Sequence, residues 1–514
     1  MLDKFFAAGA SALALAIATP AIAQDAPAPA AAPAAAPTMS FGEWGYDPAG
    51  LDTSVDPGDD FFAYANGKWL AANPLPPEFS RYGAFTLLSE KSTTDVKAII
   101  DELVAKDPAT LTNDEARIVA AYNAFADTAA IDAAGLAPAK PYLDAIMGAN
   151  SLPALAAVWG RPGMPSPLGG GVTVDAKEPT RYSVAFGAGG LGLPDRDNYL
   201  KTGERDVEIQ TKYREYLAFL LGQAGYSDAA GMAQKVYAFE DQIARTVSWD
   251  RATRRNRDLT YNALSPAELA ALDPAFPLGA YLNASGYDKT DRFIVGDLPP
   301  GEARVAELGI DAATVAKIGG GTPAMMALLR ATPIDVLEAW TVKSFLDSNA
   351  SVLPTTIDEA NFAFRGTVLN GTPEQRARWK RAIGEAESLI GERVGAAYAA
   401  RYFPPANKAA MEDLVVNLRK ALAISLQEND WMSAATKKEA MAKLEAFDPK
   451  IGYRDNLETY EGLEIDAGSP LANRIAASEW NRNYRLGQLG GPIDRTEWGM
   501  LPQTVNAYYN PTKN

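Results

Sequence analysis

Residues 59–69 read DDFFAYANGKW, and this stretch combines a helix start with a dense aromatic run. The adjacent carboxyl groups of Asp59 and Asp60 resemble the acid pair that a glycosidase needs. Neighbouring residues of an extended segment point in opposite directions, however, which arranges the two groups poorly for that chemistry. We therefore interpret Asp59 or Asp60 as the N-cap of a helix that begins at Phe61. The aromatic residues of this helix are expected to pack in a core.

Helical spacing of apolar residues extends over most of the chain beyond this start. Apolar side chains recur at intervals of three and four residues, which is typical of amphipathic helices. The predicted helices are Leu87–Leu103, Asp114–Phe125, Val207–Leu221, Ala230–Val247, Thr332–Leu346, Glu374–Tyr402, Lys408–Gln427 and Ser433–Ala446. Ser433 is the expected N-cap of the last helix. The fold class is therefore mainly α.

Strand-like sequence is confined to two places. The segments GVTVD at 171–175 and YSVAF at 182–186 flank a Lys-Glu-Pro turn and predict one β-hairpin. The tail at 498–509 is expected to be extended rather than helical.

Composition excludes several kinds of chemistry. The chain has 514 residues with a formal net charge of −16, and it contains no histidine and no cysteine. An acidic chain of this kind is a poor partner for nucleic acid. Without histidine and cysteine it cannot build an imidazole zinc site, a His general base, a Ser-His-Asp triad or a thiol nucleophile. The basic cluster Arg251, Arg254, Arg255 and Arg257 is interpreted as a set of ion pairs.

The N-terminus predicts export. Lys4 precedes an apolar run that ends before Pro20, and small residues lead to an expected cleavage after Ala23. Residues 1–23 are thus predicted to be a signal peptide and residues 24–40 an Ala/Pro-rich linker, with the folded part beginning near Phe41. No later stretch is apolar enough for a membrane span. We expect a periplasmic or secreted protein; the alternative is a retained N-terminal anchor.

Two glycine-rich loops were considered as nucleotide sites. Residues 187–192 read GAGGLG and match the G-x-G-x-x-G pattern. Pro194 follows, however, where a helix should open toward a pyrophosphate. Residues 319–323, GGGTP, precede a helix but lack the lysine of a phosphate-binding loop. Neither loop is therefore interpreted as a nucleotide site.

Several motifs occur in an order that matches one enzyme family. They are DDFFAYANGKW (59–69), GLGLPDRD (190–197), NFAF (361–364), RARWK (376–380), YFP (402–404), WMS (431–433) with TK (436–437), KIGY (450–453), DRTEWGM (494–500) and VNAYYNP (505–511). From about Asp56 to Asn514 the chain resembles the neprilysin-like zinc metallopeptidases, peptidase family M13. Ordered agreement over this length is more specific than any single motif.

The resemblance implies a fold of two lobes. A large helical cap would cover a thermolysin-like α+β catalytic lobe, of which this chain holds an incomplete beginning. The implied division places an N-terminal segment at 41–80 on the catalytic lobe, the cap at 81–452, and the start of a truncated catalytic lobe at 453–514. The cavity between the lobes is expected to admit short peptides.

The resemblance also implies a set of site residues. In the family, an H-E-x-x-H helix and a later Glu bind one zinc ion, and the first Glu activates the attacking water. The present chain contains no such motif, so we predict no catalytic residue and no metal ligand within it. Zinc is the cofactor expected of the complete enzyme. Asn506 and Ala507 are predicted to bind substrate, because in the family this pair lies on the edge strand that holds the peptide main chain.

The expected function is that of an exported zinc metalloendopeptidase or oligopeptidase, which hydrolyses short peptides with zinc-activated water. The chain alone is expected to be inactive, and truncation is the favoured explanation. One alternative is a non-catalytic periplasmic peptide-binding or scaffold module. Another is half of a split peptidase, with a separate chain that supplies the zinc helix. Truncation predicts exposed apolar residues and an open sheet edge in the tail from Asp494.

Overall fold

The computed structural model describes residues 48–513. The chain divides into two units, Met1–Pro48 and Ala49–Asn514, and the fold described below is that of the second unit. The predicted signal peptide, the linker and the expected start at Phe41 lie outside the described residues. Within those residues, no helix combines the length and the apolar character that a membrane crossing requires.

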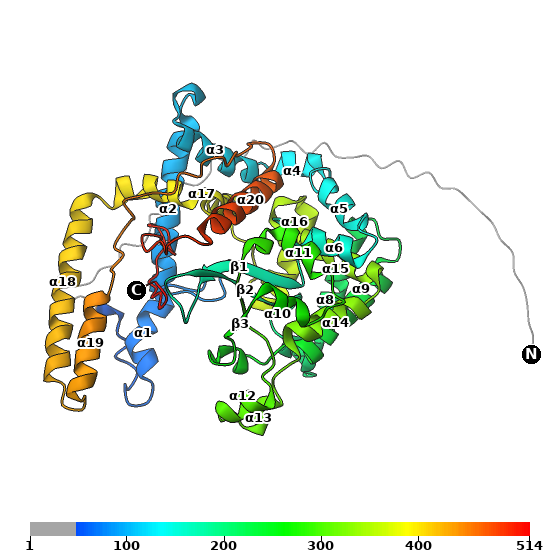
Figure 1. The fold of residues 1–514 in the computed structure, drawn as a ribbon. Coiled ribbons are helices and arrows are strands. Elements are labelled where there is room, and N and C mark those ends of the chain that lie inside the picture. The colour runs from blue at the N-terminus through cyan, green and yellow to red at the C-terminus, as the bar shows by residue number, and fades with distance from the viewer. Residues whose placement is uncertain (1–47, 514) are drawn as a thin grey trace, which may run out of the picture. The chain divides into compact units, whose positions relative to one another are not determined.

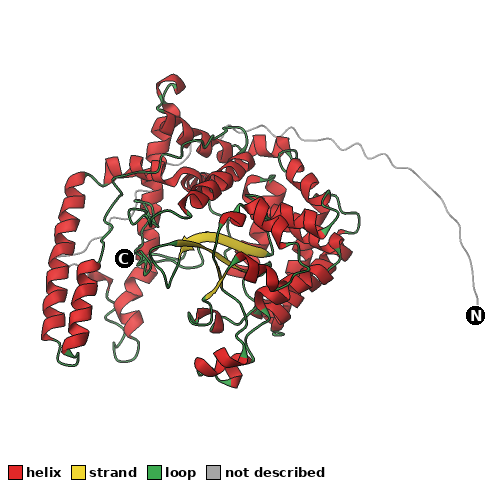
Figure 2. Ribbon diagram, viewed as in Figure 1, coloured by secondary structure: helices red, strands yellow, loops and turns green. Residues whose placement is uncertain are grey.

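Helices make up most of the described chain, as Figures 1 and 2 show, and this confirms the mainly α fold class. The first group of helices comprises α1 (Phe61–Ala72), α2 (Ala84–Ala105), α3 (Asn113–Ala126), α4 (Thr128–Ala134), α5 (Lys140–Met147) and α6 (Leu152–Trp159). The middle group comprises α7 (Asp197–Leu200), α8 (Glu204–Gln223), α9 (Ala229–Gln242), α10 (Pro266–Ala271), α11 (Leu278–Ser285), α12 (Glu302–Glu307), α13 (Ala312–Val315), α14 (Gly321–Ala331), α15 (Ile334–Ser348) and α16 (Thr355–Asn361). The last group comprises α17 (Arg378–Tyr402), α18 (Pro405–Glu428), α19 (Ala434–Ala446) and α20 (Pro470–Gln488).

Short helical segments supplement these elements. Two π-helical segments, Ile243–Val247 and Phe362–Leu369, continue α9 and α16. The 3-10 turns are Pro48–Gly50, Pro108–Thr110, Thr253–Arg255, Tyr287–Lys289 and Ala350–Val352.

Capping explains where several predicted helices begin. Asp60 accepts a hydrogen bond from the backbone N–H of Ala63 at 2.9 Å, so the helix start at Phe61 is confirmed. Ser433 caps α19 in the same way through the N–H of Thr436 at 3.1 Å. In both places the side-chain oxygen satisfies a backbone donor that has no partner within the helix.

Several predicted helices begin up to four residues from their expected starts, and some helices were not predicted. The helix predicted from Glu374 begins at Arg378, because the Glu374 N–H donates to the carbonyl of Pro77 at 3.1 Å instead of entering a helix. Helix α20 was not predicted at all. It begins at Pro470 after the N-cap Ser469, and both residues are favourable at those positions.

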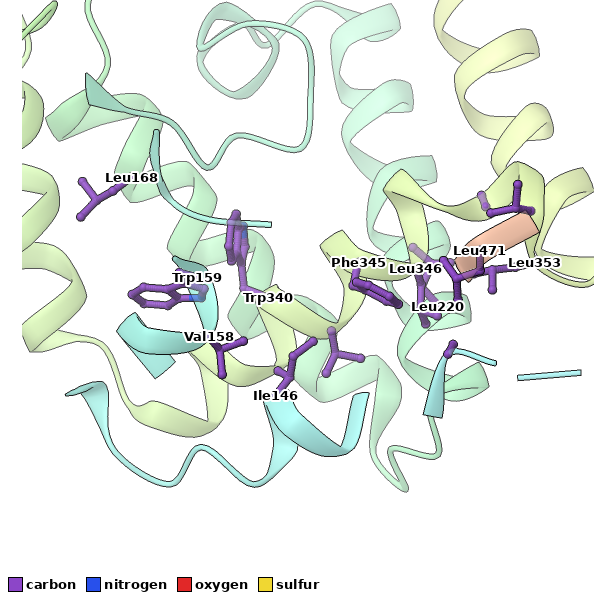
Figure 3. Close-up of a cluster of buried hydrophobic side chains, with 14 of the residues drawn as sticks. Ile146, Val158, Trp159, Leu168, Leu220, Trp340, Phe345, Leu346, Leu353 and Leu471 are labelled. Atoms are coloured by element: carbon purple, nitrogen blue, oxygen red, sulfur yellow. The ribbon is translucent and has the colours of Figure 1, made fainter. Parts of the chain in front are cut away.

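The main core lies among the helices of the first and middle groups. Figure 3 shows part of it, with Trp159, Trp340 and Phe345 among the buried side chains. The two indole N–H groups are satisfied, since Trp159 donates to the Thr341 hydroxyl at 2.9 Å and Trp340 donates to the Gly190 carbonyl at 3.0 Å. Each buried side chain of this size stabilises the fold by about 1.5–3 kcal/mol.

A four-stranded sheet accompanies the helices in the order β1-β2-β4-β3. The predicted hairpin is confirmed as β1 (Leu168–Val174) and β2 (Tyr182–Ala188), which pair antiparallel with Val172 opposite Val184. The short strands β3 (Asn262–Leu264) and β4 (Phe293–Val295) were not predicted, and β4 pairs parallel to β2.

Besides the short helices α12 and α13, three longer helices bury no residue. Helices α1, α18 and α19 contain no buried residue, and α18 packs against α19 (Figure 1). The predicted core packing of the aromatic run in α1 is therefore wrong for Phe61 and Phe62, which are 69% and 65% exposed. The aromatic run predicts the helix, but burial depends on a neighbouring element, and no described segment covers these two rings.

Candidate functional site

Asn506 and Ala507 lie on the wall of a cavity of about 830 Å³. The segment around them is irregular, and no strand of the described sheet includes either residue. The tail is thus not helical, but it turns at residues 501–504 and lacks the edge strand that the resemblance implied. Both residues are exposed, so their polar groups are accessible from the cavity.

The polar groups of this pair are engaged locally. The Asn506 side-chain oxygen accepts the N–H of Ala507 at 2.9 Å, and the Asn506 N–H donates to the Thr504 carbonyl at 3.0 Å. The Asn506 side chain still offers its NH₂ group as a donor, and its oxygen has a second lone pair that can accept. Both groups are at an exposed position. A peptide main chain has the complementary donors and acceptors.

The other walls of this cavity are largely apolar. Val172 and Val174 of β1 form one side, and Met411 of α18 and Phe447 form another. Tyr509 stacks on Phe447 with ring centroids 5.8 Å apart and an interplanar angle of 10°. The combination of apolar walls and an exposed amide fits a ligand with both side chains and a polar main chain.

Charged residues that line the cavity also hold the tail in place. Glu497 pairs with Arg485 of α20 at 2.5 Å and with Lys513. Burial acts to raise the pKa of the Glu497 carboxyl, but the hydrogen bond from Lys513 and the charge of Arg485 outweigh it and hold the pKa below its ordinary value. Glu497 is therefore a carboxylate at neutral pH and ties both ends of the tail to α20.

A second cavity of about 710 Å³ lies between α17 and α20. Two arginines on its wall form ion pairs: Arg454 with Glu392 at 3.0 Å and Arg474 with Glu385 at 2.6 Å. Arg485, Glu497 and Trp498 line both cavities. These pairs indicate that the charged side chains hold α17, α20 and the following segments together.

Neither the predicted arginine cluster nor the glycine-rich loop at 187–192 forms a ligand site. Arg254 and Arg251 contact Asp195 at 2.8 and 3.4 Å, so the ion-pair interpretation is confirmed for these two residues. The loop GAGGLG leaves β2 and is followed by α7, a single helical turn that starts only at Asp197. This arrangement provides no helix N-terminus at the loop for a pyrophosphate, as the sequence indicated.

A buried charged network under this loop was not predicted. Lys343 and Glu240 form an ion pair with side chains only 2% and 0% exposed. Tyr199 and Tyr213 donate to Glu240 at 2.7 and 2.8 Å, and the backbone N–H groups of Gly192 and Leu193 donate to the Tyr199 hydroxyl. Burial, followed by the charge of Glu240, raises the pKa of Tyr199 and Tyr213 well above the usual value. The partners lie far apart in sequence, so no local pattern reveals them.

The described residues do not fit a zinc site. No cluster of three or more His, Cys, Asp or Glu side chains occurs in residues 48–513. Zinc in proteins is held mainly by imidazole, thiolate and carboxylate groups, and this sequence has neither imidazole nor thiol. We therefore assign no catalytic step through a metal to these residues.

Comparisons with known proteins place the chain among peptidases. The profile of peptidase family M13 matches residues 57–454. Endothelin-converting enzyme 1 of Bos taurus is 26% identical over 489 residues, covering 90% of this chain and 61% of that enzyme. Neprilysin-3 of Drosophila melanogaster is 25% identical over 492 residues, covering 90% of this chain and 60% of that protein. The chain thus spans about six tenths of the length of these relatives.

Solved structures agree with this placement. The Mycobacterium tuberculosis zinc metalloprotease Zmp1, in complex with an inhibitor, matches with a TM-score of 0.79 and 31% identity, covering 90% of this chain and 68% of that one. PepO from Lactobacillus rhamnosis matches with a TM-score of 0.74 at 21% identity, covering 89% of this chain and 70% of that one, and shares the fold. The match to the family profile over most of the sequence, together with the likeness to Zmp1, shows that the chain belongs to peptidase family M13, the neprilysin-like peptidases.

Proposed function

We propose that this chain is part of an exported zinc metalloendopeptidase or oligopeptidase that hydrolyses short peptides with zinc-activated water. One observation carries the proposal: in an M13 chain, Asn506 and Ala507 are exposed on the wall of a largely apolar cavity. Their assigned role is to bind the substrate main chain through the Asn506 amide and the backbone groups, as a peptide strand is added to an edge.

The zinc ligands of the proposed enzyme would lie outside this sequence. Two imidazoles one helical turn apart are needed for H-E-x-x-H, and the sequence contains no histidine. The chain by itself is therefore proposed to be inactive. Its contribution to the enzyme would be to shape the peptide cavity and to hold the substrate.

The proposed organisation follows the implied lobes. Residues 1–23 would direct export, residues 24–40 would link, and residues 41–80 would pack on the catalytic lobe. The exposed Phe61 and Phe62 support such packing for α1. The cap would comprise residues 81–452 and the start of the catalytic lobe residues 453–514, and the end of the family profile at residue 454 supports this boundary.

Peptide hydrolysis and peptide binding by purified residues 24–514 test this proposal. We expect no cleavage of an internally quenched peptide when zinc is added. Asn506→Ala should weaken peptide binding by about three- to tenfold, since a main-chain hydrogen bond is lost. Asn417→Ala is the matched control, because Asn417 is exposed on α18 and bonds to Asp413 of the same helix.

The natural protein provides the complementary test. In a periplasmic extract, a mass above that of residues 24–514 with bound zinc would support the proposed enzyme. Zinc-dependent cleavage by the purified chain alone would contradict the proposed inactivity. Equal peptide affinity of wild type and Asn506→Ala would remove Asn506 from the substrate site.

A further inference from the structure

Gln503 is the last buried residue before the proposed substrate residues. It is 7% exposed, whereas none of the described residues from Thr504 to Lys513 is buried. The chain therefore leaves the protein interior at Gln503, three residues ahead of Asn506. The position of Gln503 limits where Asn506 and Ala507 can lie.

Two helices hold Gln503 from two sides. The Ser92 hydroxyl of α2 donates to the Gln503 carbonyl at 2.7 Å. The Gln503 side-chain amide donates to the Glu387 carboxylate of α17 at 2.8 Å. One contact thus fixes the main chain and the other fixes the side chain. Hydrogen bonds that are buried, or that involve a charged group, are stronger than exposed neutral ones.

The residues just before Gln503 lie in a groove of α17. A Cβ atom at Gly391 would come within 2.7 Å of the Leu501 Cδ1, and one at Gly395 would come within 2.5 Å of the Pro502 Cδ. Both distances are too short for non-bonded carbon atoms. At Gly391 a shift of the flexible Leu501 side chain would relieve the contact, whereas at Gly395 the rigid Pro502 ring favours glycine. The two glycines lie four residues apart and hence on one face of the helix.

We propose that Gln503 is a positioning residue for peptide binding: with Ser92 and Glu387 it fixes the course of residues 504–509 and so places Asn506 and Ala507 against the cavity. The proposal rests on the proposed function for its ligand, a short peptide. Its structural part, the fixing of residues 504–509, can be measured without any ligand. Residues of α2 and α17 thereby act on a site to which they contribute no ligand-binding group.

The test combines hydrogen–deuterium exchange with peptide binding, both on residues 24–514. The variants Gln503→Ala and Ser92→Ala each remove one hydrogen bond of the anchor. We expect each to speed amide exchange in 504–509 and to raise the Kd of a fluorescein-labelled Ala/Leu hexapeptide by about tenfold. Thr93→Ala is the matched control, because the Thr93 hydroxyl bonds only to the Ser89 carbonyl within α2 at 2.9 Å. It should change the Kd by less than about twofold.

Swapping the amide and the carboxylate between positions 503 and 387 distinguishes a positioning role from a general loss of structure. Gln503→Glu alone places two carboxyl groups together and should raise the Kd at least as much as Gln503→Ala. Combining it with Glu387→Gln restores one amide and one carboxylate. We expect the double variant to return the Kd to within about threefold of wild type and to slow exchange in 504–509 again.

The outcomes distinguish the two proposals. Unchanged exchange in 504–509 for Gln503→Ala and Ser92→Ala would overturn the anchor. Faster exchange without any change in Kd would also overturn it, since position would then not govern binding. Normal exchange together with no peptide binding by the wild-type chain would instead count against the proposed function.

Discussion

Helices α17 and α18 are consecutive and nearly equal in length, with 25 and 24 residues, yet they differ completely in burial. α17 buries residues along its length, including Ile383 and Leu389, and packs against α2 and α3. α18 buries none, and its Leu418 is 59% exposed. Both helices have apolar residues at helical spacing, and both were predicted. Spacing therefore predicts the helix, whereas the neighbouring elements decide whether its apolar face is covered.

The exposed face of α18 is a continuous apolar stripe. Met411, Leu414, Leu418 and Leu422 recur at intervals of three and four residues and are all exposed. Stripes of this kind usually mark a surface that contacts another protein segment. The expected exposure of apolar residues in the tail is also confirmed for Tyr508 and Tyr509, but the larger set lies on α1 and α18.

The largest effect on stability is expected inside the core, at the ion pair of Lys343 and Glu240. Lys343→Met leaves the Glu240 carboxylate buried without its cation, which should lower the free energy of unfolding by about 3–5 kcal/mol. Urea denaturation measures this change. Adding Glu240→Gln should recover much of the loss. If Lys343→Met lowers the free energy of unfolding by less than about 1 kcal/mol, the Glu240 carboxylate is not buried without a partner as inferred here.

A matched pair of alanine substitutions measures the contrast between α17 and α18 directly. Ile383→Ala removes a buried side chain and should lower the free energy of unfolding by about 2–5 kcal/mol, through lost burial and a cavity. Leu418→Ala should change it by less than about 0.5 kcal/mol. Similar losses at the two positions would show that the stripe on α18 is covered in solution.

Acid should weaken the attachment of the tail through Glu497. The pKa of Glu497 is lowered in the folded chain, so its ion pairs stabilise the fold above the ordinary glutamate pKa of 4.5 and this contribution is lost as pH falls below that value. Glu497→Gln should cost about 1–2 kcal/mol at pH 7 and flatten the pH dependence of stability below the ordinary glutamate pKa. Urea denaturation across this range checks both effects. An unchanged slope would exclude a role of Glu497 in acid sensitivity.

The smallest effect on unfolding is expected on the stripe of α18, where the readout is association. Leu418→Glu combined with Leu422→Glu should change the free energy of unfolding by less than about 0.5 kcal/mol. It should lower self-association in analytical ultracentrifugation, because charges interrupt the apolar surface. Lys420→Glu is the control on the same helix. Equal association of all three proteins would show that the stripe does not drive self-association.

The sequence could predict the helices but only part of their boundaries. Asp60 and Ser433 are local caps, so the starts of α1 and α19 follow from neighbouring residues. The start of α17 depends on Pro77, about 300 residues earlier in the chain. Helix α20 carried a usable local signal in Ser469-Pro470, but its mixed polar composition concealed it.

For the candidate site, the sequence could predict which residues belong to it but not what surrounds them. The motif around Asn506 and Ala507 indicated the proposed substrate residues through resemblance. The cavity beside them, the pairing of Glu497 with Arg485 and the anchor at Gln503 were not predicted. The cavity walls come from β1, α18 and the tail, which meet only in the folded chain.

By itself the sequence determined the mainly α fold, the hairpin, the helix start at Phe61 and the family, because periodicity, capping and motifs act between residues close in the chain. Only the tertiary structure decided which apolar faces are buried, how Lys343 and Glu240 pair, and where the tail leaves the interior at Gln503. These depend on contacts between distant segments, such as Ser92 with Gln503, whose hydrogen bond spans 411 residues. Local sequence patterns carry no record of such partners, since they form only when packing brings the segments together.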